Sequence, residues 1–175
     1  AFERVAASGD SHLTFVAGHS GVGKSVFVGE IVKHVIEKRA FFISGKLGEM
    51  EQSIPHSVII QAFQGLFDQL LSEPEDRLNY WRHKLSKAVY PNGRIITDVL
   101  PIAKHIITDQ PPLLRLEPKE TQNRFNQCFL DLIKILADSK HPLVLFLDDL
   151  QWADSSIFSL LDLLIVNKVK HLYVI

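Results

Sequence analysis

The nine residues AGHSGVGKS, at positions 17–25, decide the fold that we predict for this chain. An apolar run, LTFVA (13–17), leads into them, and the segment that follows (24–39) repeats apolar residues at helical spacing. A strand, a glycine-rich turn and a helix in this order are the context that a phosphate-binding turn needs. The turn matches the pattern G-x-x-x-x-G-K-[ST] at Gly18, Gly23, Lys24 and Ser25.

The physical chemistry of this turn predicts which atoms would hold a phosphate. Glycine lets the backbone bend tightly round an anion, so that the amides of residues 21–25 point inward. The positive end of the following helix is then aimed at the same anion. The Lys24 ammonium would reach the β- and γ-phosphates, and the Ser25 hydroxyl would coordinate Mg²⁺. An ordinary glycine-rich turn without a ligand is the alternative.

Two competing glycine motifs do not fit this stretch. A dinucleotide-binding motif would need glycine in place of Val26, and a hydrolase nucleophile elbow would need glycine in place of Val22. For His19, a phosphate contact and an exposed loop side chain both stay open. The predicted nucleotide contacts are nine consecutive residues: Gly18, His19, Ser20, Gly21, Val22, Gly23, Lys24, Ser25 and Val26.

A second apolar run, HPLVLFLDD (141–149), ends in two carboxylates. It predicts a buried strand, and open α/β sheets build their sites at the carboxyl ends of such strands. We predict that Asp148 holds Mg²⁺, directly or through water, and that Asp149 orients the attacking water. Lys24 and Asp149 are thus the predicted catalytic residues, and Ser25 and Asp148 the predicted metal ligands. A solvated strand end is the alternative.

Shorter apolar runs complete the predicted sheet. AFFISG (40–45) and HLYVI (171–175) are rich in strand-forming residues. The first strand, the helix after the turn and the strand over 40–45 form a βαβ unit, which places its strands parallel through a right-handed crossover.

Helical spacing predicts the remaining elements. Apolar residues recur at three- and four-residue steps over 119–137, and a further helix runs from Asp154 or Ser155 to about Val166, with Asp154 as a candidate cap. The segment 46–110 has a helical pattern interrupted by four prolines, so we expect several short helices there.

Composition sets the class of the chain. With 175 residues, 46% hydrophobic and 22% charged, residues 1–175 form one globular domain by expectation. A formal net charge of -1 gives no support for nucleic-acid binding. The single cysteine, Cys128, fits a reducing compartment, and no apolar stretch reaches the roughly 18 residues of a membrane span. We therefore expect a cytoplasmic protein that is not inserted in a membrane.

The stretches AGHSGVGKS and LVLFLDDLQWAD together resemble the ATPase core of the AAA-type signalling NTPases, the branch related to origin-recognition ATPases and STAND switches. ISGKL, SIPHSVIIQAFQGL and YWRHKL also resemble that branch, so the similarity spans almost the whole chain. The resemblance implies an α/β fold of the P-loop NTPase (AAA/ASCE) type, a three-layer αβα sandwich with a mainly parallel sheet. It also implies ATP with Mg²⁺, and a regulatory module beside flanking domains of the same chain.

The chain departs from that family in two respects. Asp149 stands where typical AAA-type ATPases carry Glu, although Asp is usual in the STAND branch. The family also continues past a fourth strand into a sensor residue, a fifth strand and a helical lid. The comparison therefore implies a domain truncated before its last strand and lid.

Several other side chains have candidate roles. Arg94, Arg115 and Arg124 could supply an arginine finger, but we expect the finger from another domain, a neighbouring subunit in a homo-oligomer, or the lid. Trp152 is expected to pack beneath the site rather than to contact another domain, and Cys128 to pack within a helix layer. For Gln151, positioning of water and simple solvation are equally open.

These observations favour a Mg²⁺-ATP-dependent regulatory switch with slow hydrolysis. The guanine-reading N-K-x-D motif is absent, which by itself leaves ATP and GTP both open. ATP, with ADP as its product, is the nucleotide that the family resemblance implies. Two alternatives stay open: a P-loop kinase that phosphorylates a small acceptor, and a non-catalytic scaffold that binds nucleotide.

Overall fold

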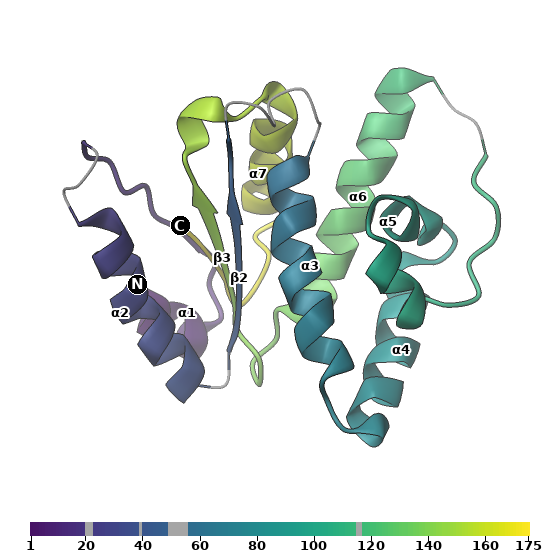
Figure 1. Ribbon diagram of the computed structural model, residues 1–175, viewed down its shortest axis with the longest axis horizontal. Coiled ribbons are helices and arrows are strands. Elements are labelled where there is room, and N and C mark those ends of the chain that lie inside the picture. The colour runs from purple at the N-terminus through teal and green to yellow at the C-terminus, as the bar shows by residue number, and fades with distance from the viewer. Residues whose placement is uncertain (20–22, 39, 49–55, 115–116) are drawn as a thin grey trace.

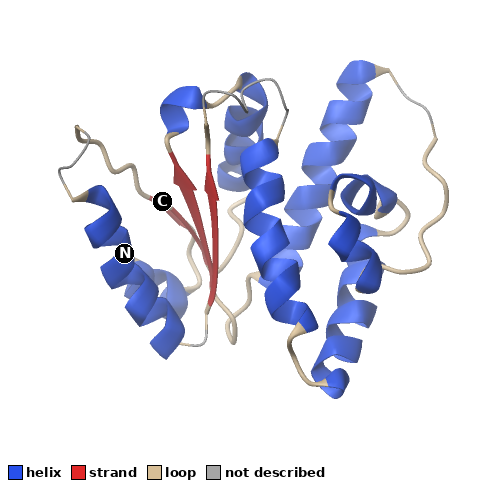
Figure 2. Cartoon of the chain, in the orientation of Figure 1, coloured by secondary structure: helices blue, strands red, loops and turns tan. Residues whose placement is uncertain are grey.

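The structure is a computed structural model that describes residues 1–19, 23–38, 40–48, 56–114 and 117–175. Within them, a parallel sheet is flanked by helices on both faces (Figure 1, Figure 2). The strands are β1 (His12–Leu13), β2 (Phe41–Lys46), β3 (Leu143–Asp148) and β4 (Leu172–Val174). They lie in the order β1-β4-β3-β2, and every neighbouring pair is parallel.

The helices of the described residues form layers on the two sides of this sheet. They are α1 (Phe2–Ser8), α2 (Lys24–Glu37), α3 (Ser57–Leu71), α4 (Glu75–Val89), α5 (Arg94–Val99), the 3-10 helices η2 (Pro101–His105) and η3 (Leu150–Trp152), α6 (Pro118–Leu136) and α7 (Ser155–Val166). α1 and α2 cover one face, and α3, α6 and α7 share a core with the other. α4, α5 and η2 pack farther out, against α3 and α6 (Figure 1). The predicted αβα sandwich is confirmed, with this additional helical layer.

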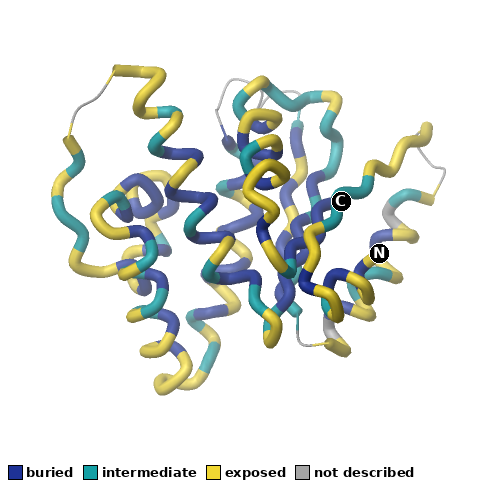
Figure 3. The backbone as a smooth tube through the Cα atoms, turned by 180° about the vertical axis from the view of Figure 1, so that it is seen from behind, coloured by how far each residue is buried: buried dark blue, intermediate teal, exposed yellow. Residues whose placement is uncertain are grey.

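The central strand β3 is buried on both faces. Leu143, Leu145 and Leu147 belong to the core shared with α3, whereas Val144 lies in the core beneath α1 and α2. Figure 3 shows buried residues along the strands and on the inner sides of the helices, and exposed residues on the outer sides. This two-sided burial is the reason that the run is continuously apolar rather than alternating.

The first strand is shorter than predicted and shifted toward the N-terminus. β1 pairs only His12 and Leu13 with β4, and Thr14 N adds one bond to Val174 O (2.9 Å). The predicted strand over 13–17 is therefore wrong beyond this point. Residues 15–17 make no strand pairing within the described part of the chain. Phe15 is accordingly 68% exposed.

The observed helices agree with the prediction more closely than the first strand does. α2, α6 and α7 lie within two residues of their predicted bounds. In the middle segment, α3 and α4 have 15 residues each and are longer than expected, because the prolines stand at helix boundaries. Pro74 occupies the N-cap position of α4, Pro91 lies just after the end of that helix, and Pro101 is the first residue of η2. Pro55 lies outside the described residues. No helix in the described ranges is long and apolar enough to cross a membrane.

A close approach between β2 and α3 fixes the end of β2. Gly45 lies against the start of α3, and a Cβ at this position would collide with the backbone carbonyl of Val58. Val58 is fully buried, so it cannot move aside at low cost. The next residue, Lys46, donates its backbone N–H to the Gln61 side chain of α3. The carboxyl end of β2 is therefore anchored to α3.

Candidate functional site

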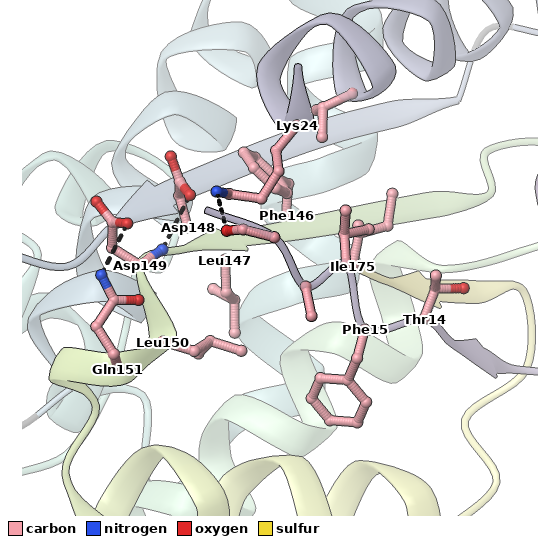
Figure 4. Close-up of a pocket in the computed structure, with 14 residues that line it drawn as sticks. Thr14, Phe15, Lys24, Phe146, Leu147, Asp148, Asp149, Leu150, Gln151 and Ile175 are labelled. Atoms are coloured by element: carbon pink, nitrogen blue, oxygen red, sulfur yellow. Dashed lines mark hydrogen bonds between the residues drawn. The ribbon is translucent and has the colours of Figure 1, made fainter. Parts of the chain in front are cut away.

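A cavity of about 440 Å³ lies at the carboxyl edge of the sheet. Four segments line it: the chain leaving β1, the start of α2, the end of β3 with the turn after it, and Ile175 after β4 (Figure 4). The volume falls within the range of roughly 300–1,000 Å³ that is usual for small-molecule sites. Its lining residues are Thr14, Phe15, Val16, Ala17, Gly18, Lys24, Val28, Phe146, Leu147, Asp148, Asp149, Leu150, Gln151 and Ile175.

Lys24 is the first residue of α2, and its side chain reaches back over the turn. Its Nζ donates to the carbonyl oxygens of Gly18 (2.6 Å) and His19 (3.0 Å). An ammonium has three N–H groups, so these bonds leave one for an acceptor in the cavity. Gly23 precedes the helix with φ 96°, a left-handed conformation that favours glycine, and its carbonyl accepts the first helical bond, from Phe27 N (3.0 Å).

The structure describes part of the predicted phosphate-binding turn. Gly18 and Lys24 line the cavity, and His19 is exposed with its carbonyl bound to Lys24. Val26 is 70% exposed. Ser20, Gly21 and Val22 lie outside the described residues, and so does the side chain of Ser25.

The two carboxylates enter the cavity from the end of β3. Asp148 closes the strand, and Asp149 has a left-handed backbone (φ 60°, ψ 42°) that turns the chain into η3. The Asp149 N–H donates to Asp148 Oδ1 (2.9 Å), and Gln151 Nε2 donates to Asp149 Oδ1 (3.1 Å). Both carboxylates line the same cavity as Lys24 (Figure 4). Residues 124 positions apart in the sequence are thus brought to one place.

One charged residue of this edge, Lys46, is not among the residues that the sequence motifs predict. Lys46 is the last residue of β2 and the register partner of Asp148. Its Nζ lies 3.9 Å from Asp148 Oδ2 and 3.5 Å from Asp149 Oδ2. The strand was predicted to stop at Gly45, which assigned Lys46 to the helical segment. A lysine directly after a predicted parallel strand was the available signal, because the carboxyl ends of parallel strands share one edge.

The donor chemistry of the site fits a nucleotide with a hard divalent cation. Carboxylate oxygens are ligands that Mg²⁺ prefers, and Mg²⁺ usually keeps several waters and phosphate oxygens beside one or two carboxylates. Among the described residues no cluster of three or more His, Cys, Asp or Glu could hold a metal by itself. A cation held by Asp148 would therefore take most of its ligands from phosphate and water.

The candidate arginines and Cys128 are not among the residues that line the cavity in the described part of the chain. Arg124 donates to Leu114 O (2.8 Å) and, like Arg94, is not among the cavity-lining residues, whereas Arg115 lies outside the described part. Cys128 is buried, and burial raises the pKa of its thiol to about 12, so the packing role is confirmed.

The residues after Asp149 divide between the site and the core. Trp152 is half-buried and packs against the main core, as predicted. Asp154 caps α7, because its Oδ1 accepts from Ser156 N (2.9 Å) and Ile157 N (3.2 Å). Gln151 both lines the cavity and holds Asp149, so it has a place at the site.

The strand order, the basic turn and the acidic strand end define the class of this protein. β4 lies between the strand that leads into the glycine-rich turn and the strand that ends in two carboxylates, which is a P-loop NTPase sheet of the AAA type. A family model described as "AAA ATPase domain" matches residues 1–175, so the chain belongs to that family.

Two curated relatives are named as histidine kinases and are much longer than this chain. The chain is 36% identical over 156 residues to "Hybrid signal transduction histidine kinase G" of Dictyostelium discoideum, covering 89% of this chain and 4% of that protein. It is 23% identical over 165 residues to "Histidine protein kinase 1" of Candida albicans, covering 85% of this chain and 7% of that protein. The chain thus spans less than a tenth of these relatives. No solved structure matches it.

Proposed function

We propose that this chain binds ATP with Mg²⁺ in the cavity at the sheet edge and hydrolyses it slowly, as a regulatory switch module of a larger signalling protein. The observation that carries the proposal is the shared cavity: the Lys24 ammonium and the carboxylates of Asp148 and Asp149 line it from different elements. A polyphosphate with a divalent cation is a ligand that satisfies both charges at once.

Each side chain has a distinct part in this proposal. In this proposal the amides of residues 21–25 would face the phosphates, and Lys24 would donate its remaining N–H to the β- and γ-phosphates. Ser25 and Asp148 hold the cation, and Asp149 orients the attacking water. When bound, Mg²⁺ would neutralise the charge that develops on the transferring phosphate.

Two features support slow rather than fast turnover. The carboxylate proposed to orient water is Asp149, whose side chain is one methylene shorter than that of glutamate. In addition, Lys46 and Gln151 hold this carboxylate. No described arginine lines the cavity, so we propose that a finger comes from another domain or from a second subunit of a homo-oligomer.

The signalling role rests on the relatives. Both are named as histidine kinases and are many times longer than this chain. We propose that ATP and ADP favour different contacts between this module and the flanking domains of the same protein.

Calorimetry on the full-length protein tests the nucleotide and the metal together. ATP, GTP and ADP are titrated with and without Mg²⁺, and we expect ATP and ADP to bind more tightly than GTP. Lys24→Ala should weaken ATP binding about tenfold or more, because a charged hydrogen bond is lost. Lys33→Ala is the matched control, since Lys33 lies on the same helix and pairs only with Glu30 among the described residues.

Phosphate release separates binding from hydrolysis. Asp149→Asn should keep ATP binding and abolish release of phosphate. If Asp149→Asn hydrolyses ATP at the parental rate, the proposed role of this carboxylate is wrong. Transfer of phosphate to a small acceptor above the water background would favour the kinase alternative, and thermal stabilisation by ATP with no release would favour the scaffold.

A further inference from the structure

Every carboxylate oxygen at the end of β3 already has a partner. On Asp148, Oδ1 accepts the Asp149 N–H and Oδ2 faces Lys46 Nζ. On Asp149, Oδ1 accepts from Gln151 and Oδ2 faces the same ammonium. One lysine therefore bridges the outer oxygens of both acids. It offsets half of their combined negative charge.

The side chain of Lys46 is free to move, but its backbone is not. The Lys46 N–H is bound by Gln61, and the following Leu47 N–H donates to Asp148 O (3.1 Å). The Lys46 side chain itself is 67% exposed, and the carboxylates are its only charged partners in the described chain. The ammonium can therefore leave the carboxylates by rotation about side-chain bonds, with β2 remaining in register.

We propose that Lys46 is a built-in competitor of the divalent cation. It occupies the outer oxygens of the carboxylate pair before nucleotide arrives, and it must withdraw for Mg²⁺ to bind there at full strength. This inference rests on the proposed function and concerns the regulation of that same site.

Lys46 and Mg²⁺ compete because both are cations that contact the same pair of oxygens, Asp148 Oδ2 and Asp149 Oδ2. Mg²⁺ demands oxygen ligands at about 2.0–2.1 Å in near-octahedral order, whereas the ammonium holds the same oxygens at 3.5 Å and 3.9 Å in a looser contact. Two cations on one carboxylate pair repel each other, so binding of either weakens the other. Lys46 thus raises the Mg²⁺ concentration that is needed to fill the site.

The test compares nucleotide affinity with and without metal. The affinity of the full-length protein for a β,γ-imido analogue of ATP is measured by calorimetry in excess Mg²⁺ and in EDTA. The ratio of the two affinities reports how strongly the metal promotes nucleotide binding, and a change of affinity that is the same in both buffers drops out of it. Lys46→Met should raise this ratio about threefold to fivefold, as expected for loss of a cation that is largely exposed and partly screened.

Three further variants make the result specific. Lys46→Arg keeps the charge and should keep the parental ratio. Lys46→Gln removes the charge with a polar side chain and should behave like Lys46→Met, which covers the event that one of them folds poorly. Lys170→Met removes a lysine that precedes β4, at the opposite end of the strands, and should leave the ratio unchanged. Circular dichroism melting of each variant shows that the fold is retained.

The outcomes distinguish this inference from the proposed function. A parental protein that binds no nucleotide in either buffer contradicts the proposed function. A parental protein that binds nucleotide more tightly with Mg²⁺, together with Lys46→Met and Lys46→Gln at the parental ratio, overturns the role of Lys46 and leaves the proposed function standing.

Discussion

The contact between Gly45 and the start of α3 gives a sharp test of the fold around the site. Replacement of Gly45 by Ala adds a Cβ that would collide with the backbone carbonyl and the side chain of Val58. A carbonyl cannot rotate away as a side chain can, and Val58 is fully buried, so β2 and α3 must separate. Overpacking of this kind costs about 1–3 kcal/mol. For a domain of this size, that lowers the melting temperature by roughly 2–4 °C for each kcal/mol.

The same Gly→Ala change within α3, at Gly65, should have the opposite effect on stability. A Cβ on Gly65 meets nothing within 4 Å, so Gly65→Ala should stabilise the protein by about 0.5–1 kcal/mol through helix propensity. Urea denaturation followed by circular dichroism measures both variants against the parent. If Gly45→Ala unfolds at the parental urea concentration or above it, the close packing of β2 on α3 is not as described.

Three other predictions concern single side chains. Asp154→Ala removes the cap of α7 and should destabilise the domain by about 1 kcal/mol, seen as a lower urea midpoint, while Asp154→Ser should recover most of it. Cys128, whose thiol pKa burial raises to about 12, should not react with iodoacetamide at pH 8 until urea unfolds the chain; rapid labelling of the native protein would contradict its burial. Burial lowers the pKa of His56 below its usual value of 6.5, so the unfolded state takes up the proton first and stability should fall as the pH drops through 6.5. His56→Gln should lessen the loss of stability between pH 7.5 and pH 5.5, and an unchanged loss would refute this origin.

The sequence predicted the structure best where the local pattern of residue types indicates one kind of element. The apolar run that ends at Asp148 predicted a buried strand, and the spacing of Phe125, Phe129 and Leu132 predicted a helix; both predictions are confirmed. The two motifs also predicted that Lys24 and the two aspartates would lie at the same edge of the sheet. The glycine-rich turn and the aspartate pair each follow a parallel strand, and such strands have their carboxyl ends at one edge. These features depend on residue spacing and on the order of the elements along the chain, and both can be read from the sequence.

Features that depend on a partner element were missed. β1 is defined by its pairing of His12 and Leu13 with β4, which periodicity over 13–17 cannot show. Lys46 lies in the ISGKL segment that resembles the family, but its place at the site follows only from the register that sets it opposite Asp148. α1 was not predicted either, because its seven residues are too few for periodicity to stand out, and it is held by burial of Phe2 and Val5.

The insertion of β4 between β1 and β3 works as a spacer for the chemistry at the sheet edge. Neighbouring strands stand about 4.8 Å apart, so one strand in between puts the basic turn and the acidic strand end on backbones roughly 10 Å apart. Direct pairing of β1 with β3 would halve that gap, and the lysine arm would neutralise the aspartates without a guest. The intervening strand therefore sets the chain that leads into the basic turn apart from the acidic strand end, whereas Lys46, on the strand paired directly with β3, contacts both acids.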